Sequence, residues 1–325
     1  MNIRRPILPA AVAGVAVLGL ATALTACSAN TTDGRTDGKL DVVASFYPMQ
    51  FLAERIGGGH VHVSSLTKPG TEPHDLDISA RQTADLSKAG LVVYLKGLQP
   101  AVDAAVKQAE PKHVAEASSY TSLEDHGTEV AGDEHGHDEH GEGEHGHSGE
   151  DAGSDPHIWL DPVRYAQVAE GVGKALEKAD PDHAAVYKKN TAALVKQLGA
   201  LNDDFRTGLK NRASDTFITT HAAFGYLAER YGLRQEAISG IDPESEPSPA
   251  RVKDLHEIAK KDKVGTVFFE TLVSDKTAKT LAGDLGLRTD VLDPIEGISG
   301  KSKGRDYFEV MHANLKALEK ALGTK

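Results

Sequence analysis

From residue 39 onward, short apolar runs alternate with longer stretches in which apolar residues recur every three or four positions. Short apolar runs bounded by Gly, Pro or polar residues are typical of strands, and the longer period is typical of helices. The pattern predicts strands over 40–46, 61–66, 91–95, 216–219, 266–269 and 289–292. Between them it predicts helices over 48–56, 79–88, 100–109, 163–178, 222–230, 248–260, 275–285 and 306–322. Such alternation indicates parallel βα units.

One helix stands out by its length. Asp180 is a plausible N-cap with Pro181 after it, and apolar side chains recur from Leu194 to Leu209 at spacings of four and three. A helix of about 30 residues, ending near Asn211, would span about 45 Å at 1.5 Å per residue. We expect a rigid connector between two α/β lobes rather than part of one core. The expected fold is therefore an N-terminal α/β lobe over 40–160, connecting helices over 161–212 and a C-terminal α/β lobe over 213–325.

The first 26 residues have the layout of a secretory signal: a positive start at Arg4-Arg5, an apolar run over 7–23 and small residues at the exit. The alternative, a single transmembrane helix, is disfavoured because the run is short and contains Pro9. The ending Leu-Thr-Ala-Cys resembles the lipobox of bacterial lipoproteins. That resemblance implies that Cys27 becomes the lipidated first residue.

Cys27 is the only cysteine, so no internal disulfide can form and any metal site must use His, Asp and Glu. Residues 27–39 are rich in Thr, Asp, Gly and Asn, and predict a flexible tether from the membrane.

The excess negative charge lies in one segment, 123–155, which consists mainly of Gly, His, Asp and Glu with almost nothing apolar. Twelve acids lie between Glu124 and Asp155, while the other 36 balance the 36 basic residues, so this segment accounts for the net charge of -12. Its composition predicts a disordered loop. Its imidazoles suggest a second, looser zinc-binding function, the alternative being a solvated linker; they belong to His126, His135, His137, His140, His145 and His147. The acidic balance argues against a nucleic-acid partner.

Four residues outside that loop have metal-binding side chains and lie after predicted strands or in loops between predicted elements. His221 and Asp293 directly follow predicted strands, His74 lies in a Pro/Gly-rich loop, and His157 lies where the chain re-enters structure after the loop. Ligands of open α/β sheets bind beyond the carboxyl ends of the strands. Three imidazoles and a carboxylate suit a tetrahedral zinc ion, although any one of these histidines taken alone could be a hydrogen-bonded loop residue. Glu270 either orients a ligand or caps a helix.

At these residues the chain resembles the metal-binding proteins of ABC importers for zinc and manganese, and specifically the zinc-uptake branch. The resemblance covers nearly all of 39–322 and rests on five motifs in order: Ala44-Ser-Phe-Tyr-Pro48, Pro69-Gly-Thr-Glu-Pro-His-Asp75, Asp155-Pro-His-Ile-Trp-Leu-Asp-Pro162, Thr220-His-Ala-Ala-Phe-Gly-Tyr226 and Asp293-Pro-Ile-Glu-Gly297.

The resemblance implies two α/β lobes, a long backbone helix and a metal ion held in the cleft between the lobes by His74, His157, His221 and Asp293. In manganese-binding members the position of His221 is often a carboxylate, so a histidine points to zinc. In some zinc-branch members water or a different carboxylate completes the site.

The leading hypothesis is capture of zinc outside the cytoplasm by a monomer anchored to the outer face of the cell membrane, with delivery to the permease of an ABC importer and no catalysis. Three alternatives stay open. They are a manganese-binding member of the same family, a zinc hydrolase with Asp293 or Glu270 as base, and a surface adhesin or metal chaperone.

Overall fold

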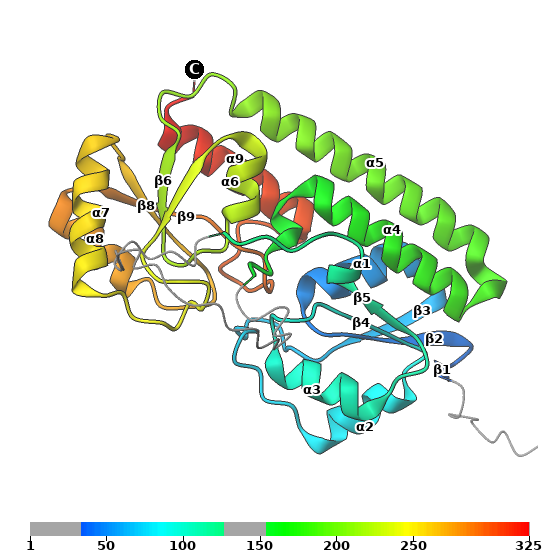
Figure 1. Ribbon diagram of the computed structural model, residues 1–325. Coiled ribbons are helices and arrows are strands. Elements are labelled where there is room, and N and C mark those ends of the chain that lie inside the picture. Colours follow the sequence, from blue (N-terminus) through cyan, green and yellow to red (C-terminus); the bar gives the residue numbers. More distant parts are fainter. Residues whose placement is uncertain (1–33, 127–153, 325) are drawn as a thin grey trace, which may run out of the picture. The chain divides into compact units, whose positions relative to one another are not determined.

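The computed structural model describes residues 34–126 and 154–324 (Figure 1). Cys27, the signal-like segment and five of the six loop histidines lie outside these residues. Within the described part of the chain, no helix combines the length and the apolar character that a membrane crossing requires.

The N-terminal lobe is built on a five-stranded sheet in the order β1-β2-β4-β5, with β3 also paired to β2. All pairs are parallel except β1 with β2. The strands are β1 Arg35–Thr36, β2 Lys39–Ala44, β3 Val61–Ser65, β4 Leu91–Tyr94 and β5 Val114–Glu116. The helical elements are α1 Tyr47–Gly57, η1 Gly58–His60, α2 Ala80–Lys88, α3 Pro100–Ala109 and η2 Ala117–Ser119.

The C-terminal lobe has a four-stranded, wholly parallel sheet in the order β7-β6-β8-β9. Its strands are β6 Thr216–Thr219, β7 Arg234–Ala237, β8 Thr266–Phe269 and β9 Arg288–Val291. Its helices are α6 Gly225–Tyr231, α7 Pro249–Lys261, α8 Lys276–Leu285 and α9 Tyr307–Leu322. Between the lobes the chain forms η3 Ile158–Leu160, α4 Pro162–Ala179, η4 Pro181–His183 and α5 Ala184–Gly208.

Alternate residues of each central strand enter different cores, as the two-residue period of a strand requires. In β2, Val42 and Ala44 pack toward α1 and α4, while Val43 packs toward α2 and α3. In β6, Phe217 packs toward α6 and α9, while Ile218 packs toward α7 and α8. The inner faces of both sheets thereby contribute to one shared hydrophobic cluster.

The long helix differs from the prediction. Asp180 is the C-cap of α4, Pro181–His183 form a short 3-10 turn, and α5 runs over 25 residues to Gly208. It does connect the lobes, but it is also part of a core, one that the two lobes share. Leu194, Leu198 and Phe205 are buried in the shared cluster, and α5 packs along α4, α1 and α9 (Figure 1).

Two boundaries also need correction. Residues 34–39 were expected in the tether, yet Arg35 and Thr36 pair with β2, because the chain turns back at Gly38 with a φ of 77°. The expected disordered loop over 123–155 is structured at its base, where Glu124 and Asp155 form an antiparallel bridge. Strands β5 and β7 were missed because β5 is only three residues long and β7, Arg-Gln-Glu-Ala, has no apolar pattern.

Candidate metal centre

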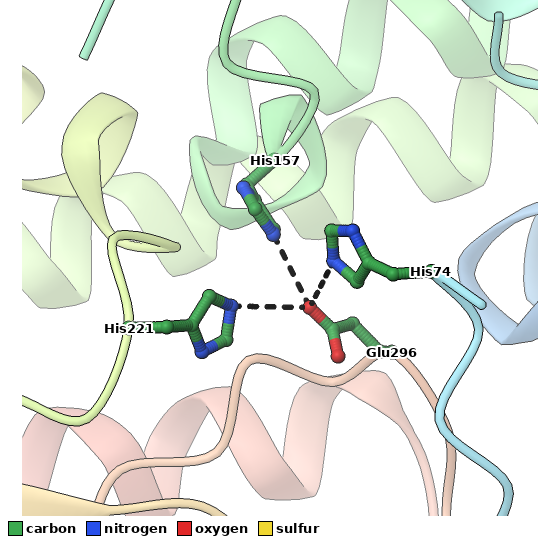
Figure 2. Close-up of side chains that lie close together, drawn as sticks. All are labelled: His74, His157, His221 and Glu296. Atoms are coloured by element: carbon green, nitrogen blue, oxygen red, sulfur yellow. Dashed lines mark hydrogen bonds and ion pairs between the residues drawn. The ribbon is translucent and has the colours of Figure 1, made fainter. Parts of the chain in front are cut away.

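Three of the four predicted ligands meet at one point, where segments following the strands of both sheets come together. His74 follows β3, His221 follows β6, and His157 directly precedes η3. Their Nε2 atoms lie 3.4, 3.5 and 3.2 Å, respectively, from Oε1 of Glu296. Figure 2 shows the three rings directed at this oxygen. One ligand atom from each of the four residues fits within a 4.8 Å span. The side chains of His157, His221 and Glu296 are fully buried, and that of His74 is 10% exposed.

The fourth residue is therefore Glu296, and Asp293 is not in the cluster. Asp293 organises the turn that presents Glu296: its Oδ1 accepts a hydrogen bond from Ile295 N at 2.9 Å, and its Oδ2 accepts one from Thr271 at 3.0 Å. The Asn314 side chain clamps the Asp293 backbone at 2.9 and 2.7 Å. The two carboxylates stand three residues apart in one motif, so residue type alone could not distinguish them.

The backbone before Glu296 adopts an unusual conformation. Ile295 has a φ of 61°, a left-handed value that is strained for a β-branched residue and persists only where the surroundings enforce it. Ile295 is fully buried, and Trp159 Nε1 donates to Pro294 O at 2.6 Å. This bond links the His157 segment directly to the Glu296 turn.

His157 is oriented by Asp155. Asp155 belongs to one of the five sequence motifs, but no function was predicted for it from the sequence. Asp155 Oδ1 accepts from His157 N at 2.9 Å and lies 2.7 Å from His157 Nδ1. A carboxylate at Nδ1 favours the tautomer that leaves the Nε2 lone pair free, which is how metal-binding histidines are commonly oriented.

Glu270 orients His221 as Asp155 orients His157. Of its two predicted roles, orienting a ligand or capping a helix, the structure supports the first. Its Oε1 contacts His221 Nδ1 and accepts a hydrogen bond from Thr220. The backbone of His221 is also fixed, because its carbonyl accepts bonds from Thr219 at 2.8 Å and from Gln235 at 3.0 Å. The His74 backbone N–H donates to the Glu72 carboxylate at 3.0 Å.

The charges in the cluster stabilise one another. Burial lowers the pKa of His157, but Asp155 and Glu296 outweigh it and leave the pKa raised. Burial likewise opposes charge on His221, yet Glu270 and Glu296 hold its pKa well above the ordinary value. Burial works to raise the pKa of Glu296, but hydrogen bonds from the three histidines keep it well below its usual range. The pKa of Asp293, by contrast, is raised, chiefly by burial.

This donor set is suited to one kind of ligand. A buried group of three imidazole nitrogens and one ionised carboxylate can coordinate a divalent ion of the zinc class tetrahedrally. Of the six loop histidines, the structure describes only His126, and it lies elsewhere, beside Glu124 and Glu229.

Comparison with known proteins places this chain in a family. Residues 42–321 match the family described as "ZnuA: Zinc-uptake complex component A periplasmic". The chain is 36% identical over 309 residues to the high-affinity zinc uptake system protein ZnuA of Bacillus subtilis, covering 92% of this chain and 94% of that protein.

A second relative is longer. The chain is 37% identical over 301 residues to the zinc-binding lipoprotein AdcA of Streptococcus pneumoniae, covering 91% of this chain but 58% of that protein, so it spans little more than half of AdcA. The crystal structure of Zn(II)-bound AdcA superposes with a TM-score of 0.72 at 33% identity, covering 89% of this chain and 59% of that one.

Proposed function

We propose, from the premise that this chain belongs to the ZnuA family of zinc-uptake components, that it captures zinc outside the cytoplasm and delivers it to a membrane importer. The observation that supports this most directly is the buried convergence of His74, His157 and His221 on Glu296. Zinc is the cargo here, and these four side chains are its proposed ligands. The relatives named for zinc binding and zinc uptake support the same choice of metal.

The donor set favours capture over catalysis. Four protein ligands would fill a tetrahedral zinc ion, whereas catalytic zinc keeps one position for water. Asp293 and Glu270, the bases considered for a hydrolase, are both engaged in holding ligands or the turn that presents one. We therefore propose a binding protein without enzymatic activity.

The proposed partner is the permease of an ABC-type importer, and the proposed location is the outer face of the cell membrane. The family description as a periplasmic component and the lipoprotein name of AdcA support an extracytoplasmic location. Attachment through a lipid on Cys27 fits the sequence around it.

Metal titration tests this function. Zinc should bind at one tight site. The affinity for manganese should be lower than that for zinc by a factor of about 100 or more, because affinity for nitrogen and oxygen donors rises from manganese to zinc. Changing His74, His157 or His221 to Ala should each weaken zinc binding by about 100-fold or more, because each removes a ligand. Competition with a chromogenic zinc chelator measures these affinities.

The control is His256→Ala, because His256 lies on α7 and outside the cluster. Equal loss of affinity in the control and the three ligand variants would overturn the assignment. Tighter binding of manganese than of zinc would favour the manganese alternative, and zinc-dependent hydrolytic turnover would favour an enzyme.

A further inference from the structure

The three histidines of the metal centre are held in two different ways. Asp155 contacts Nδ1 of His157 at 2.7 Å, and Glu270 contacts Nδ1 of His221. Among the described residues, no carboxylate lies within hydrogen-bond distance of Nδ1 of His74, whose ring is bonded in the cluster through Nε2. Of the four proposed ligands, only the side chain of His74 is partly exposed. The position of this imidazole must therefore come from the backbone that carries it.

That backbone is a segment without regular structure, which joins β3 to α2. The Glu72 carboxylate accepts the His74 N–H at 3.0 Å, but this bond lies within the segment and moves with it. Among the described residues, one hydrogen bond ties 68–75 to the body of the N-terminal lobe. In that bond, Gln99 Nε2 donates to Pro73 O at 3.1 Å.

We propose that Gln99 is a positioning residue of the zinc site, which holds His74 in place through the carbonyl group of Pro73. This inference rests on the proposed capture of zinc at that site. Gln99 is the N-cap residue of α3 and is only 1% exposed, so its side chain is fixed by its surroundings. Pro73 directly precedes His74 in the chain, so a shift of their shared peptide unit displaces the imidazole.

The amide group of Gln99 is oriented by a second bond. Its Nε2 also donates to Thr67 Oγ1 at 3.0 Å, and Thr67 Oγ1 donates its single proton to Ser45 O at 2.8 Å. Both neighbours of Nε2 are therefore acceptors, and a reversed amide would place its own oxygen against them. Ser45 directly follows β2, and Thr67 follows β3. The amide thereby fixes the Pro73 carbonyl relative to the ends of two strands.

The residue type matters at this position. An ionised glutamate would have no proton to donate to the Pro73 carbonyl or to Thr67, and its charge would be buried without a partner. An apolar side chain would leave the same two acceptors without their donor. Glutamine supplies both N–H groups without a charge.

A competing explanation is that Gln99 only stabilises the lobe, by satisfying two buried acceptors. Removing the partner of a buried carbonyl group lowers stability wherever that group lies. The two explanations differ in what happens once His74 is removed. A residue that acts through His74 then loses its effect on zinc binding, whereas a general stabiliser keeps it.

A double-mutant cycle of Gln99→Met and His74→Ala on the full chain separates the two explanations, with zinc affinity measured by chelator competition. Methionine is similar to glutamine in length but donates no hydrogen bond. Gln99→Met alone should weaken zinc binding by about tenfold, as is typical when the partner that orients a ligand is lost. In the His74→Ala background, the same substitution should change the affinity by less than about twofold.

Asn202→Leu is the matched control. Asn202 is also a buried amide, whose Oδ1 accepts a hydrogen bond from the Tyr231 hydroxyl at 3.4 Å, and it lies outside the metal cluster. Its loss should change zinc affinity by less than about twofold, even where the protein is destabilised. Thermal unfolding of each variant verifies that it is folded.

Cobalt(II) at saturating concentration gives a readout that depends on the ligands and not on stability. Its visible absorption reports the number and geometry of the ligands, because tetrahedral cobalt absorbs more strongly than octahedral cobalt. The spectrum of Gln99→Met should move toward that of His74→Ala, because the displaced imidazole no longer completes the site. The spectrum of Asn202→Leu should match that of the unsubstituted protein.

Any of three results would overturn the role of Gln99. They are zinc binding by Gln99→Met as tight as that of Asn202→Leu, a loss of affinity that persists in full in the His74→Ala background, and a cobalt spectrum that Gln99→Met leaves unchanged. In each case the unsubstituted protein would still bind zinc tightly. If the unsubstituted protein itself lacked tight zinc binding, the capture function would fail, and the role of Gln99 with it.

Discussion

At the residue scale, the site is organised around one carboxylate oxygen. Oε1 of Glu296 contacts the Nε2 atoms of all three histidines. The carboxylate oxygens of Asp293 instead accept hydrogen bonds from Ile295 N and the Thr271 hydroxyl. The two acids therefore have separable tasks. Glu296 supplies charge to the site, and Asp293 shapes the turn that presents it.

Substituting these two acids separately tests that division. Glu296→Gln should weaken zinc binding by about 10- to 100-fold, because the amide lacks the charge while the three imidazoles remain. Asp293→Asn should weaken it by less than about threefold, because the amide oxygen can still accept the Ile295 N–H bond. Chelator competition measures both variants side by side. Equal losses would mean that Asp293 is itself a ligand.

At the scale of elements, one buried carboxylate joins the N-terminal lobe to the helices between the lobes. Asp180, at the end of α4, accepts hydrogen bonds from Arg35 at 2.6 Å and Tyr187 at 2.6 Å, and contacts His183 Nδ1 at 2.7 Å. Its side chain is fully buried. Burial alone would raise the pKa of Asp180, but these partners lower it to about 2. The network ties β1 and α5 to the end of α4.

Stability should therefore depend on pH through Asp180. Since the folded-state pKa is about 2 and the unfolded value is 3.8, the ionised carboxylate stabilises the fold fully above about pH 4. That contribution is lost as pH falls toward 2. Asp180→Asn should lower the free energy of unfolding by about 1–2 kcal/mol at pH 7, with the deficit shrinking below pH 4. Urea unfolding between pH 7 and pH 3 measures this.

Asp182→Asn is the matched control, because Asp182 is an exposed neighbour in the same turn. It should change stability by less than about 0.5 kcal/mol at any pH. A deficit in Asp180→Asn that stayed constant from pH 7 to pH 3 would show that packing, not ionisation, accounts for the loss.

At the scale of the whole molecule, the lobes share one core. Residues of both sheets, α4, α5 and α9 belong to the same buried cluster. Polar contacts also tie the C-terminal lobe to the rest of the chain. Arg230 on α6 donates two bonds to Asp161, the N-cap of α4, at 2.8 and 2.6 Å, and Tyr226 donates one to the Asp155 carbonyl. A large hinge motion would have to break these contacts and expose apolar surface.

Zinc binding should accordingly change the shape of the protein only slightly. We expect the radius of gyration to differ by less than about 1 Å between zinc-free and zinc-loaded protein, as is usual for preorganised binding surfaces. Small-angle X-ray scattering on both forms measures this, with His157→Ala plus zinc as the control for non-specific effects. A contraction of several ångströms would contradict a preformed site.

The local patterns in the sequence predicted most elements well. Strands at 216–219 and 266–269 and the helix at 100–109 have the bounds that the sequence predicted. These segments carry their own signals, namely short apolar runs and a Pro at the first helical turn. The edge strand β7 carries no such signal, because its residues, Arg-Gln-Glu-Ala, are mostly polar. It is a strand because it pairs with β6. Only the assembled sheet could reveal it.

The sequence by itself singled out the three histidines, because their motifs combine metal-binding side chains with positions after strands or at the return from the polar loop, and the three imidazoles do converge. Only the tertiary structure decided which carboxylate joins them. Asp293 and Glu296 share one motif, and a left-handed residue at Ile295 turns the later acid toward the imidazoles. The tertiary structure also decided that α5 belongs to the shared core. A helix shows its apolar face in the sequence, but the surface that buries this face comes from segments far along the chain.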